Sequence, residues 1–334
     1  MWESEKSCKL LGDAFLKIRT CVHHNFKVLA ALATAVTFVF NTALAEKKEN
    51  FSTLSKGDFQ RQLELPDSEN IQPNTPLLIE AREQYAKLPF DVGERLRFIV
   101  TYLGVKAGVA EAIVQPPIKW KKTWAHRVTG EVKNADWFSW MIQLHDSVEC
   151  VFSGTPEMFP LRFYINQQEP VTFRQSKIIN FDIEKGEIRQ LTQRKERERQ
   201  EQTFPLSRET KDAMALLYYF RENIKEGMGK DTIKFPIFTS EKTWTAEATL
   251  LKQEKIKVSG NEFDTDVYRL LSHFGHLMEQ KGDIKIWMTR DSRRLPVYIE
   301  AQVKFGYIKV ALTEWDQGAV DPTKKKVFEQ IRQN

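Results

Sequence analysis

Cysteine, net charge and long apolar runs are all scarce in this chain. Its three cysteines are too few to hold a fold together by disulfides. Its formal charge of +5, spread over 334 residues, is too dilute to indicate nucleic-acid binding. With 41% hydrophobic and 28% charged residues, the composition is globular and excludes a polytopic membrane protein or a disordered chain. The length allows two domains or one large β-rich domain.

One apolar run stands near the N-terminus, at residues 28–45. Lys27 precedes it, and it ends at Ala45 in the Ala-x-Ala pattern that signal peptidase reads. We therefore expect residues 1–45 to be a cleaved signal peptide and the mature protein to be periplasmic. The alternative is an uncleaved anchor, the only route by which we expect membrane association, although the run is short for a hydrocarbon core of about 30 Å. Acidic residues ahead of Lys27 suit a signal peptide poorly and leave the true start codon open.

The rest of the chain divides by composition. Residues 46–87 are polar and proline-bearing and are expected to form an arm or linker, with a short helix at 78–87. Residues 316–334 are expected to form a polar tail. Between them, 88–315 is predicted to be a single β-rich domain. Cys150 is the only cysteine left after cleavage, and its place on the apolar face of a strand predicts a buried, unreactive thiol.

The dominant hydrophobic period within this domain is two residues, which is typical of β-strands. In the run 137–152, Asp146 is the only polar residue on the apolar face, and a strand this long must bend or bulge. Gly104 and Gly108 are expected in the first turn, and residues 259–262 in a later one. Short connections require antiparallel neighbours. We predict a mainly β fold: a curved antiparallel meander that forms a half-barrel or barrel. Predicted strands cover 94–103, 109–115, 137–152, 160–166, 170–182, 186–192, 231–239, 243–258, 263–271, 283–290, 295–304 and 306–315.

One segment, 208–226, has helical spacing instead. Ser207 is expected to cap its N-terminus and Gly227 to end it. A lone apolar-faced helix in such a chain is expected to pack on the concave face of the sheet. The residues of its apolar face are Ala213, Leu216, Leu217, Phe220 and Ile224.

A charged run at 193–201 mixes both signs and is typical of a solvated hairpin tip or loop; the alternative is a contact with phosphate or acidic lipid. The two histidines His273 and His276 lack a third ligand, so we expect no metal and no cofactor. The lysines between Trp120 and Trp124 are expected in an exposed loop, without nucleic-acid binding. No nucleophile motif or acid–base pair is found, and we expect no catalytic residue.

Three segments resemble the bacterial domain-of-unknown-function family 3108: 89–112, 212–222 and 286–312. The resemblance implies an exported cell-envelope protein of unassigned activity, with an architecture similar to the curved-sheet lipoprotein carriers of the periplasm. It brings no catalytic residue. The residues that carry it are Phe90, Gly93, Glu94, Leu96, Gly108, Asp212, Tyr218, Tyr219, Arg221, Trp287, Thr289, Asp291, Arg294, Pro296, Val297 and Gly306.

Structural roles are expected for the most distinctive of these motif residues. Asp291 to Arg294 would form a hairpin turn, because Asp bonds its own backbone there. Pro296 would start an edge strand. Arg221 would pair with Glu94 or Asp291. The full set is Gly93, Glu94, Asp212, Arg221, Trp287, Asp291, Arg294 and Pro296.

The fold suggests a non-catalytic binding or carrier module for a hydrophobic or lipid-like ligand. An apolar space between helix and sheet would accept acyl chains, whereas the same side chains could instead simply fill the core. The alternative is an envelope scaffold that binds a protein or glycan partner through a sheet edge or the arm. An enzyme is a third hypothesis. The candidate ligand-lining residues are Phe98, Tyr102, Trp140, Leu217 and Phe220.

Overall fold

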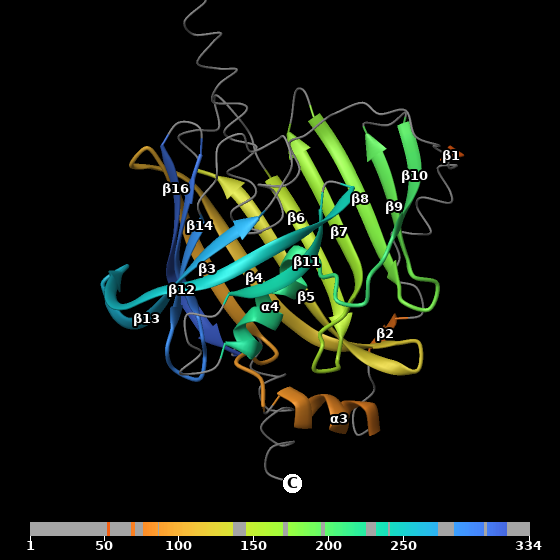
Figure 1. Ribbon diagram of the computed structural model, residues 1–334, viewed down its shortest axis with the longest axis horizontal. Helices are drawn as coiled ribbons and strands as arrows, with labels where there is room; N and C mark the ends of the chain where they lie inside the picture. Colours follow the sequence, from red (N-terminus) through yellow and green to blue (C-terminus); the bar gives the residue numbers. More distant parts are fainter. Residues whose placement is uncertain are drawn as a thin grey trace, which may run out of the picture.

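A single antiparallel sheet makes up most of the molecule (Figure 1). Its 16 strands follow the order β1-β10-β9-β8-β7-β6-β5-β4-β3-β16-β15-β14-β13-β12-β11, with β2 paired to β4. The computed structural model describes residues 52–53, 68–70, 76–85, 87–135, 145–169, 173–194, 198–224, 232–239, 241–272, 284–303 and 306–318. The predicted mainly β, antiparallel meander is confirmed.

Most of the strands overlap the predicted ranges, but β1, β2, β5 and β10 lie where no strand was predicted. Their bounds are β1 Ser52–Thr53, β2 Ser68–Asn70, β3 Glu94–Tyr102, β4 Val105–Trp120, β5 Thr123–Asn134, β6 His145–Ser153, β7 Pro160–Glu169, β8 Phe173–Asp182, β9 Glu187–Arg194, β10 Glu198–Pro205, β11 Ile233–Thr239, β12 Lys242–Val258, β13 Asn261–Ser272, β14 Ile284–Thr289, β15 Pro296–Gln302 and β16 Tyr307–Gln317. The helices are α3 Pro76–Tyr85 and α4 Ala213–Asn223.

Two glycines near the first hairpin have different roles. Gly104 lies in the β3–β4 turn with φ +81°, as predicted. Gly108 does not lie in the turn: it sits within β4, opposite Asn134. A Cβ at Gly108 would be 2.6 Å from the Lys133 carbonyl oxygen, so the glycine permits close approach of two backbones. In the predicted turn at 259–262, Ser259 and Gly260 both have positive φ, +50° and +88°, as two-residue hairpins prefer.

The sheet curls so that its two ends approach each other. β11 and β12 cross in front of the other half of the sheet in Figure 1. Phe238 of β11 lies with its ring centroid 6.2 Å from that of Phe181 in β8 and 5.3 Å from that of Phe204 in β10. No strand pairing joins β11 to β1 or β10 within the described ranges, so side chains rather than a ladder close the gap. This is the half-barrel form of the predicted fold.

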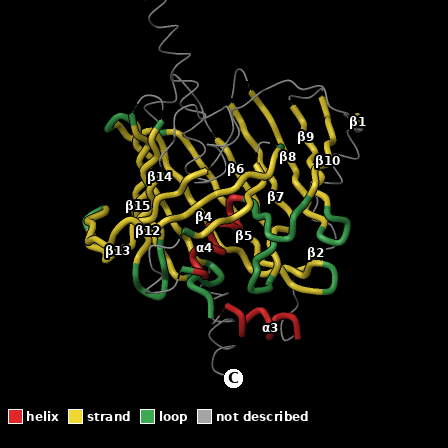
Figure 2. The backbone as a smooth tube through the Cα atoms, viewed as in Figure 1, coloured by secondary structure: helices red, strands yellow, loops and turns green. Residues whose placement is uncertain are grey.

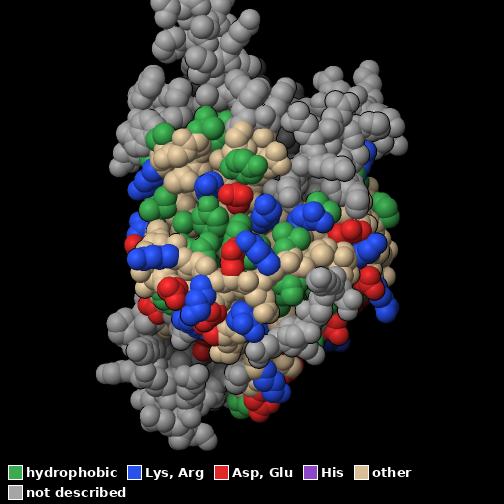
Figure 3. Space-filling model, turned by 60° about the vertical axis from the view of Figure 1, so that its left-hand side comes forward, with side chains coloured by type: hydrophobic (Ala, Val, Ile, Leu, Met, Phe, Trp, Pro, Cys, Tyr) green, Lys and Arg blue, Asp and Glu red, His purple; other side chains and the backbone are tan. Residues whose placement is uncertain are grey.

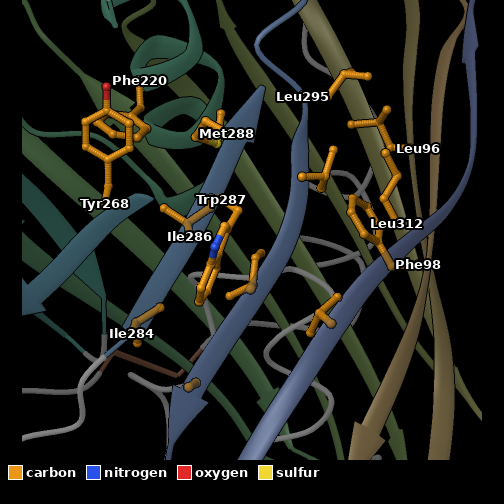
Figure 4. Close-up of a cluster of buried hydrophobic side chains, with 14 of the residues drawn as sticks. Leu96, Phe98, Phe220, Tyr268, Ile284, Ile286, Trp287, Met288, Leu295 and Leu312 are labelled. Atoms are coloured by element: carbon orange, nitrogen blue, oxygen red, sulfur yellow. The ribbon is translucent and has the colours of Figure 1, made fainter. Parts of the chain in front are cut away.

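α4 lies between the two halves of the curled sheet (Figure 2). On one side Phe220 packs edge-on against Tyr268, at 5.1 Å between ring centroids, near Met288 (Figure 4). On its other side, Met214 and Tyr218 belong to the cluster built on β4 to β9. The helix is therefore buried on two sides, not only on the single predicted face, because both halves of the sheet cover it.

The helix begins later than predicted, and Ser207 is not its cap. The cap is Asp212, whose Oδ1 accepts hydrogen bonds from the backbone N–H groups of Met214 (2.8 Å) and Ala215 (2.9 Å). Lys211, just before it, is bridged to β11 by two backbone hydrogen bonds of 2.9 Å each. This pairing holds the backbone extended, so the helix begins only at Ala213. The expected stop, Gly227, lies outside the described residues.

The charged run at 193–201 covers the end of the β9–β10 hairpin, as one of the two predictions had it, but its flanks are paired strands and not a loop. β9 continues to Arg194 and β10 begins at Glu198, and the two pair along their whole length. Arg189 forms an ion pair with Glu201 across this pair of strands. Charges of opposite sign on neighbouring strands stabilise antiparallel pairing, which explains why a charged sequence forms strands here.

Pro296 starts a strand, as predicted, but not an edge strand. β15 lies between β14 and β16. Pro296 is tolerated because it is the first residue of β15, where the register with β14 shifts at Met288. Pairing with β16 begins only at Tyr298, so proline disrupts no bond on that side.

Several segments of the predicted arm contact the body. α3 overlaps the helix predicted at 78–87, and the Tyr85 hydroxyl lies 2.8 Å from Nδ1 of His126. Both side chains are buried, and burial lowers the pKa of His126 to about 3. Residues 316–317, predicted as tail, belong to β16.

The signal peptide with Ala45, the rest of the tail, Trp140, His273 and His276 lie outside the described residues. Trp120 and Trp124 are buried at the ends of β4 and β5, whereas the lysines between them are exposed. None of the helices described is long and apolar enough to cross a membrane.

Candidate functional site

A buried arginine connects three distant parts of the chain. Arg221 of α4 is fully buried, and its guanidinium forms two hydrogen bonds with the carboxylate of Glu94, at 2.7 and 2.8 Å. It also donates to the carbonyl oxygens of Pro89 (3.0 Å), Arg293 (3.0 Å) and Arg294 (3.2 Å). Burial alone would lower the pKa of Arg221, but the charge and hydrogen bonds of Glu94 outweigh it and raise that pKa. The predicted pairing with Glu94 is confirmed.

The side chain of Arg294 in turn donates hydrogen bonds to the backbone of the helix. Its Nη1 donates to the carbonyl oxygens of Arg221 (2.8 Å) and Glu222 (2.7 Å) in the last turn of α4. A cation at this end satisfies free carbonyl groups and interacts favourably with the negative end of the helix dipole. We call Glu94, Arg221 and Arg294 the α4 anchor. It fixes the C-terminal end of the helix to β3 and to the β14–β15 turn.

Asp291 belongs to the turn beside the anchor and does not pair with Arg221. Its Oδ1 accepts hydrogen bonds from the Thr289 hydroxyl (2.8 Å) and the Arg293 backbone N–H (3.1 Å). Its carboxylate also accepts from the Arg293 side chain, with Nε at 2.9 Å. The predicted hairpin turn between Asp291 and Arg294 is confirmed by the 3.2 Å hydrogen bond from Arg294 N to the Asp291 carbonyl oxygen.

The remaining motif residues also have identifiable partners. Gly93 has φ +83°, which favours glycine, and a Cβ there would contact the backbone of Gly318 at 3.1 Å. Trp287 is buried beside Tyr298 and donates from Nε1 to Glu254 at 2.8 Å.

Asp212 and Cys150 form a buried pair at the N-terminus of α4. The Cys150 thiol donates to the Asp212 carboxylate, with Sγ 3.2 Å from Oδ2. Burial raises the pKa of Asp212 to about 6, against the opposing hydrogen bonds from Ala215, Cys150 and Met214 and the charge of Lys211. Burial and the neighbouring Asp212 raise the pKa of Cys150 well above its ordinary value. A thiol held protonated in this way is a poor nucleophile.

Four of the five predicted ligand-lining residues can be placed. Phe98 and Phe220 are buried in one cluster between α4 and the strands β11 to β16, and Tyr102 and Leu217 are partly buried against it. Trp140 lies outside the described residues. That a ligand reaches these side chains stays a prediction.

A second feature, absent from the sequence-based expectations, is a line of polar side chains on the concave face. Asp146 on β6 lies opposite Gln167 on β7, which lies opposite Gln175 on β8, which lies opposite Arg194 on β9. Asp146, Gln167 and Gln175 are 5%, 4% and 6% exposed. We call these four residues the polar row. They lie at the upper end of the sheet in Figure 1, where the arrows of β7 and β9 end.

Polarity falls along each of these strands from the polar row toward α4. On β8 the concave-face residues run from Gln175 and Lys177 to Ile179 and Phe181, all buried. The other three strands show the same order: Asp146, Val148, Cys150 and Phe152 on β6; Gln167, Ile165 and Phe163 on β7; Arg194, Thr192, Gln190 and Ile188 on β9. The concave face is thus polar at one end and apolar at the other.

Two N–H groups of this face have no hydrogen-bond partner in the part of the chain that the structure describes. Gln175 Nε2 and Arg194 Nε are buried and have no hydrogen-bond acceptor among the residues described. Leaving a buried donor unsatisfied costs about 1–3 kcal/mol. Burial lowers the pKa of Lys177; the charge of Glu241 opposes this, and that of Arg194 adds to it.

Sequence reasoning found one member of the polar row. Asp146 stood out as the single polar residue on an apolar strand face, but the strand ranges alone did not align it with Gln167, Gln175 and Arg194. The additional signal was a change of polarity within one face of the run 173–182. Only the register between strands shows that four such changes coincide.

The outer surface contrasts with this interior. On the side where β13 and β16 lie, acidic, basic and hydrophobic side chains are intermixed (Figure 3). Ion pairs such as Lys309–Glu300, at 3.7 Å, are partly exposed there. Within the described ranges, no group of three or more His, Cys, Asp and Glu side chains is placed to hold a metal ion.

The fold and its interior define an antiparallel β-protein whose sheet curls around one buried helix. The profile of the family described as "Protein of unknown function (DUF3108)" matches residues 97–313, and the chain belongs to that family. A beta-barrel-like protein of the DUF1849 family from Brucella abortus is similar at TM-score 0.45, with 9% identity, over 68% of this chain and 98% of its own. A protein from Parabacteroides distasonis, provisionally assigned as a lipoprotein, is similar at TM-score 0.33, with 10% identity, over 69% and 98% of the two chains. Comparison with functionally curated proteins gives no match.

Proposed function

We propose that the protein is a non-catalytic binding or carrier module of the cell envelope. It would hold a lipid-like ligand on the concave face of β6 to β9. The polar end of the ligand would lie at the polar row, and its apolar part would lie toward Phe163, Ile179 and Phe181. The observation that carries this proposal is the fall in polarity along four adjacent strands of one buried face.

Fold stability alone gives no reason for this gradient. A buried amide or cation without a full set of partners destabilises the folded state, whereas an apolar residue of similar size does not. Among the described residues, Gln175 and Arg194 each retain an unsatisfied buried N–H group. A ligand that supplies acceptors would remove this cost, and would do so only when bound.

The apolar half of the face offers the other contribution. Each methylene group transferred from water to an apolar surface contributes about 0.8 kcal/mol. Ile165, Ile179 and Phe163 are buried apolar side chains that follow the polar row on this face. An amphiphile with its polar end at the polar row and its apolar part toward α4 would be complementary to both halves of the face.

Support for an envelope location comes from the apolar run at 28–45 and its Ala-x-Ala end. Support for a non-catalytic role comes from the two reactive side chains nearest to α4. Asp212 caps the helix, and the pKa of Cys150 is raised away from the range of a nucleophile.

The experiment is photo-crosslinking with a fatty acid that carries a diazirine along its chain, on protein purified without detergent. Native mass spectrometry first asks whether lipid co-purifies. We then expect crosslinks at Phe163, Ile165 and Ile179, on the concave face. Tyr164 and Asn180 are alternate residues of the same strands on the opposite face and act as internal controls. Crosslinks confined to these controls, or the absence of both lipid and crosslinks, would contradict the proposal and favour the envelope scaffold.

A further inference from the structure

We propose that the polar end of the ligand is a phosphate-type anion, held by Gln175, Lys177 and Arg194. This inference rests on the proposed function, since it names the head group that the concave face recognises. The first argument is placement. Gln175 and Arg194 lie directly opposite each other on β8 and β9. Lys177 is two residues from Gln175 on the same face of β8, opposite Thr192.

The spacing suits a small anion. Side chains directly opposite in an antiparallel pair have Cβ atoms about 4.5–5.5 Å apart, and residues two apart on one strand are separated by about 7 Å. Three long side chains on this triangle can reach one tetrahedral group. Donors on two strands would contact different oxygens of the same phosphate.

The unsatisfied atoms are the second argument. Gln175 Nε2 and Arg194 Nε are both hydrogen-bond donors, and neither meets an acceptor in the described part of the chain. Gln175 is only 6% exposed. Amide and guanidinium N–H groups need acceptors, and anionic oxygens are the strongest acceptors for them. A ligand rich in donors would not satisfy these atoms.

The distribution of charge is the third argument. Lys177 and Arg194 are two neighbouring cations, and after burial the charge of Arg194 helps to lower the pKa of Lys177. Glu241 opposes this effect, and it already accepts a hydrogen bond from Gln190 Nε2 at 3.2 Å. The β10 residue opposite Arg194 is Glu198, whose side chain lies outside the described residues. Arg194 itself forms no ion pair within the described ranges.

Asp146, the acidic member of the polar row, is too distant to neutralise Arg194. It lies three strands from Arg194, or roughly 14 Å at about 4.8 Å per strand. Its carboxylate is within 3.5 Å of Gln167 Nε2. The row is therefore acidic at Asp146 on β6 and basic at Arg194 on β9, with Lys177 of β8 on the same face, and an anion would bind at the basic end.

The test compares three compounds by calorimetry with the full mature chain: dihexanoyl phosphatidic acid, dihexanoylglycerol and inorganic phosphate. The first two share their acyl chains and differ only in the phosphate. We expect phosphatidic acid to bind at least about tenfold more tightly than the diacylglycerol, because charge-assisted hydrogen bonds are made only to the phosphate. We expect Arg194→Gln and Lys177→Gln each to reduce this difference about tenfold.

Matched controls separate the site from general loss of charge. Arg189→Gln alters the same strand as Arg194, but Arg189 is paired with Glu201 and is 41% exposed. Lys185→Gln removes a turn lysine that is 68% exposed. Both controls should keep the preference for phosphatidic acid. Circular dichroism melting checks that every variant is folded.

The outcomes distinguish this inference from the proposed function. Equal binding of phosphatidic acid and diacylglycerol would overturn the anion site and leave the lipid-binding proposal standing. Loss of the preference in Arg189→Gln to the same extent as in Arg194→Gln would also overturn it. If inorganic phosphate binds as tightly as phosphatidic acid, with sensitivity to Arg194→Gln, the anion site is supported but its source is free phosphate. If no compound binds and a fluorescent fatty acid also fails, the proposed function itself is contradicted.

Discussion

Breaking the α4 anchor should destabilise the protein more than any surface substitution. Arg221→Met removes a guanidinium that makes five hydrogen bonds, two of them to Glu94. Glu94 is only 3% exposed, so its carboxylate would remain buried without a counter-ion. Removing one partner of a buried ion pair costs about 3–5 kcal/mol. For a domain of this size, that corresponds to a fall in melting temperature of roughly 6–20 °C.

The assay is thermal and urea unfolding followed by circular dichroism, with two further variants. The double variant Glu94→Gln/Arg221→Met should recover at least half of the loss, because no uncompensated charge remains buried. Arg95→Met is the matched control. Arg95 is 44% exposed on its side chain and pairs with Glu111 at 2.6 Å on the surface, so its removal should cost less than about 1 kcal/mol.

A pH series provides a second readout. A buried carboxylate without its counter-ion takes up a proton more readily when folded than when unfolded. The folded Arg221→Met variant would then bind more protons than its unfolded chain, so its deficit should shrink as the pH falls from 7 toward 4. A deficit below about 1 kcal/mol at pH 7, or a double variant as unstable as Arg221→Met, would refute the view that the anchor is a charge-balanced pair.

Three further predictions concern other buried groups. Asp212 has a pKa of about 6 in the folded protein, above its ordinary value of 3.8. This group should therefore lower the free energy of unfolding by on the order of 3 kcal/mol as the pH rises from 3.8 to 6. Asp212→Asn keeps a capping side chain, and its melting temperature should change less across that pH range. Gln175→Met should raise the stability of ligand-free protein by about 1 kcal/mol, whereas Gln115→Met, which removes a 2.8 Å hydrogen bond to Thr129, should lower it in urea titrations. Gly108→Ala should cost about 1–3 kcal/mol in the same titrations, because its Cβ would lie 2.6 Å from a carbonyl oxygen, and an unchanged midpoint would contradict the close approach.

Most of the strands were predictable because their pattern is local, although β5 and β10 were not predicted. In β3 and β14, alternation along a few residues was enough to place the elements, and the hairpin at Asp291 follows from the chemistry of Asp in turns. The start of α4 was not predictable in this way, because Lys211 is held extended by β11, a strand that follows it in the chain. The charged strand β10 was missed for a similar reason, since its stability comes from pairing with β9 rather than from its own composition.

The candidate site was harder to predict from the sequence than the fold. Arg221 was expected to pair with Glu94 or Asp291, and the structure shows that its partner is Glu94. The polar row depends on the register of β6 to β9, and a shift of one residue in any of them would move its member to the other face. A single sequence does not contain that alignment, so only Asp146 was noticed.

The α4 anchor also has a consequence for the order in which the molecule assembles. Arg221 bonds residues 127 and 132 positions earlier in the chain, and others 72 and 73 positions later. The helix therefore receives its last fixed contacts only when the hairpin ending at Arg294 has been made. Folds that depend on such remote contacts form slowly. A newly synthesised chain would thus complete the α4 anchor only when Arg294 has been added, when nearly all of the chain exists.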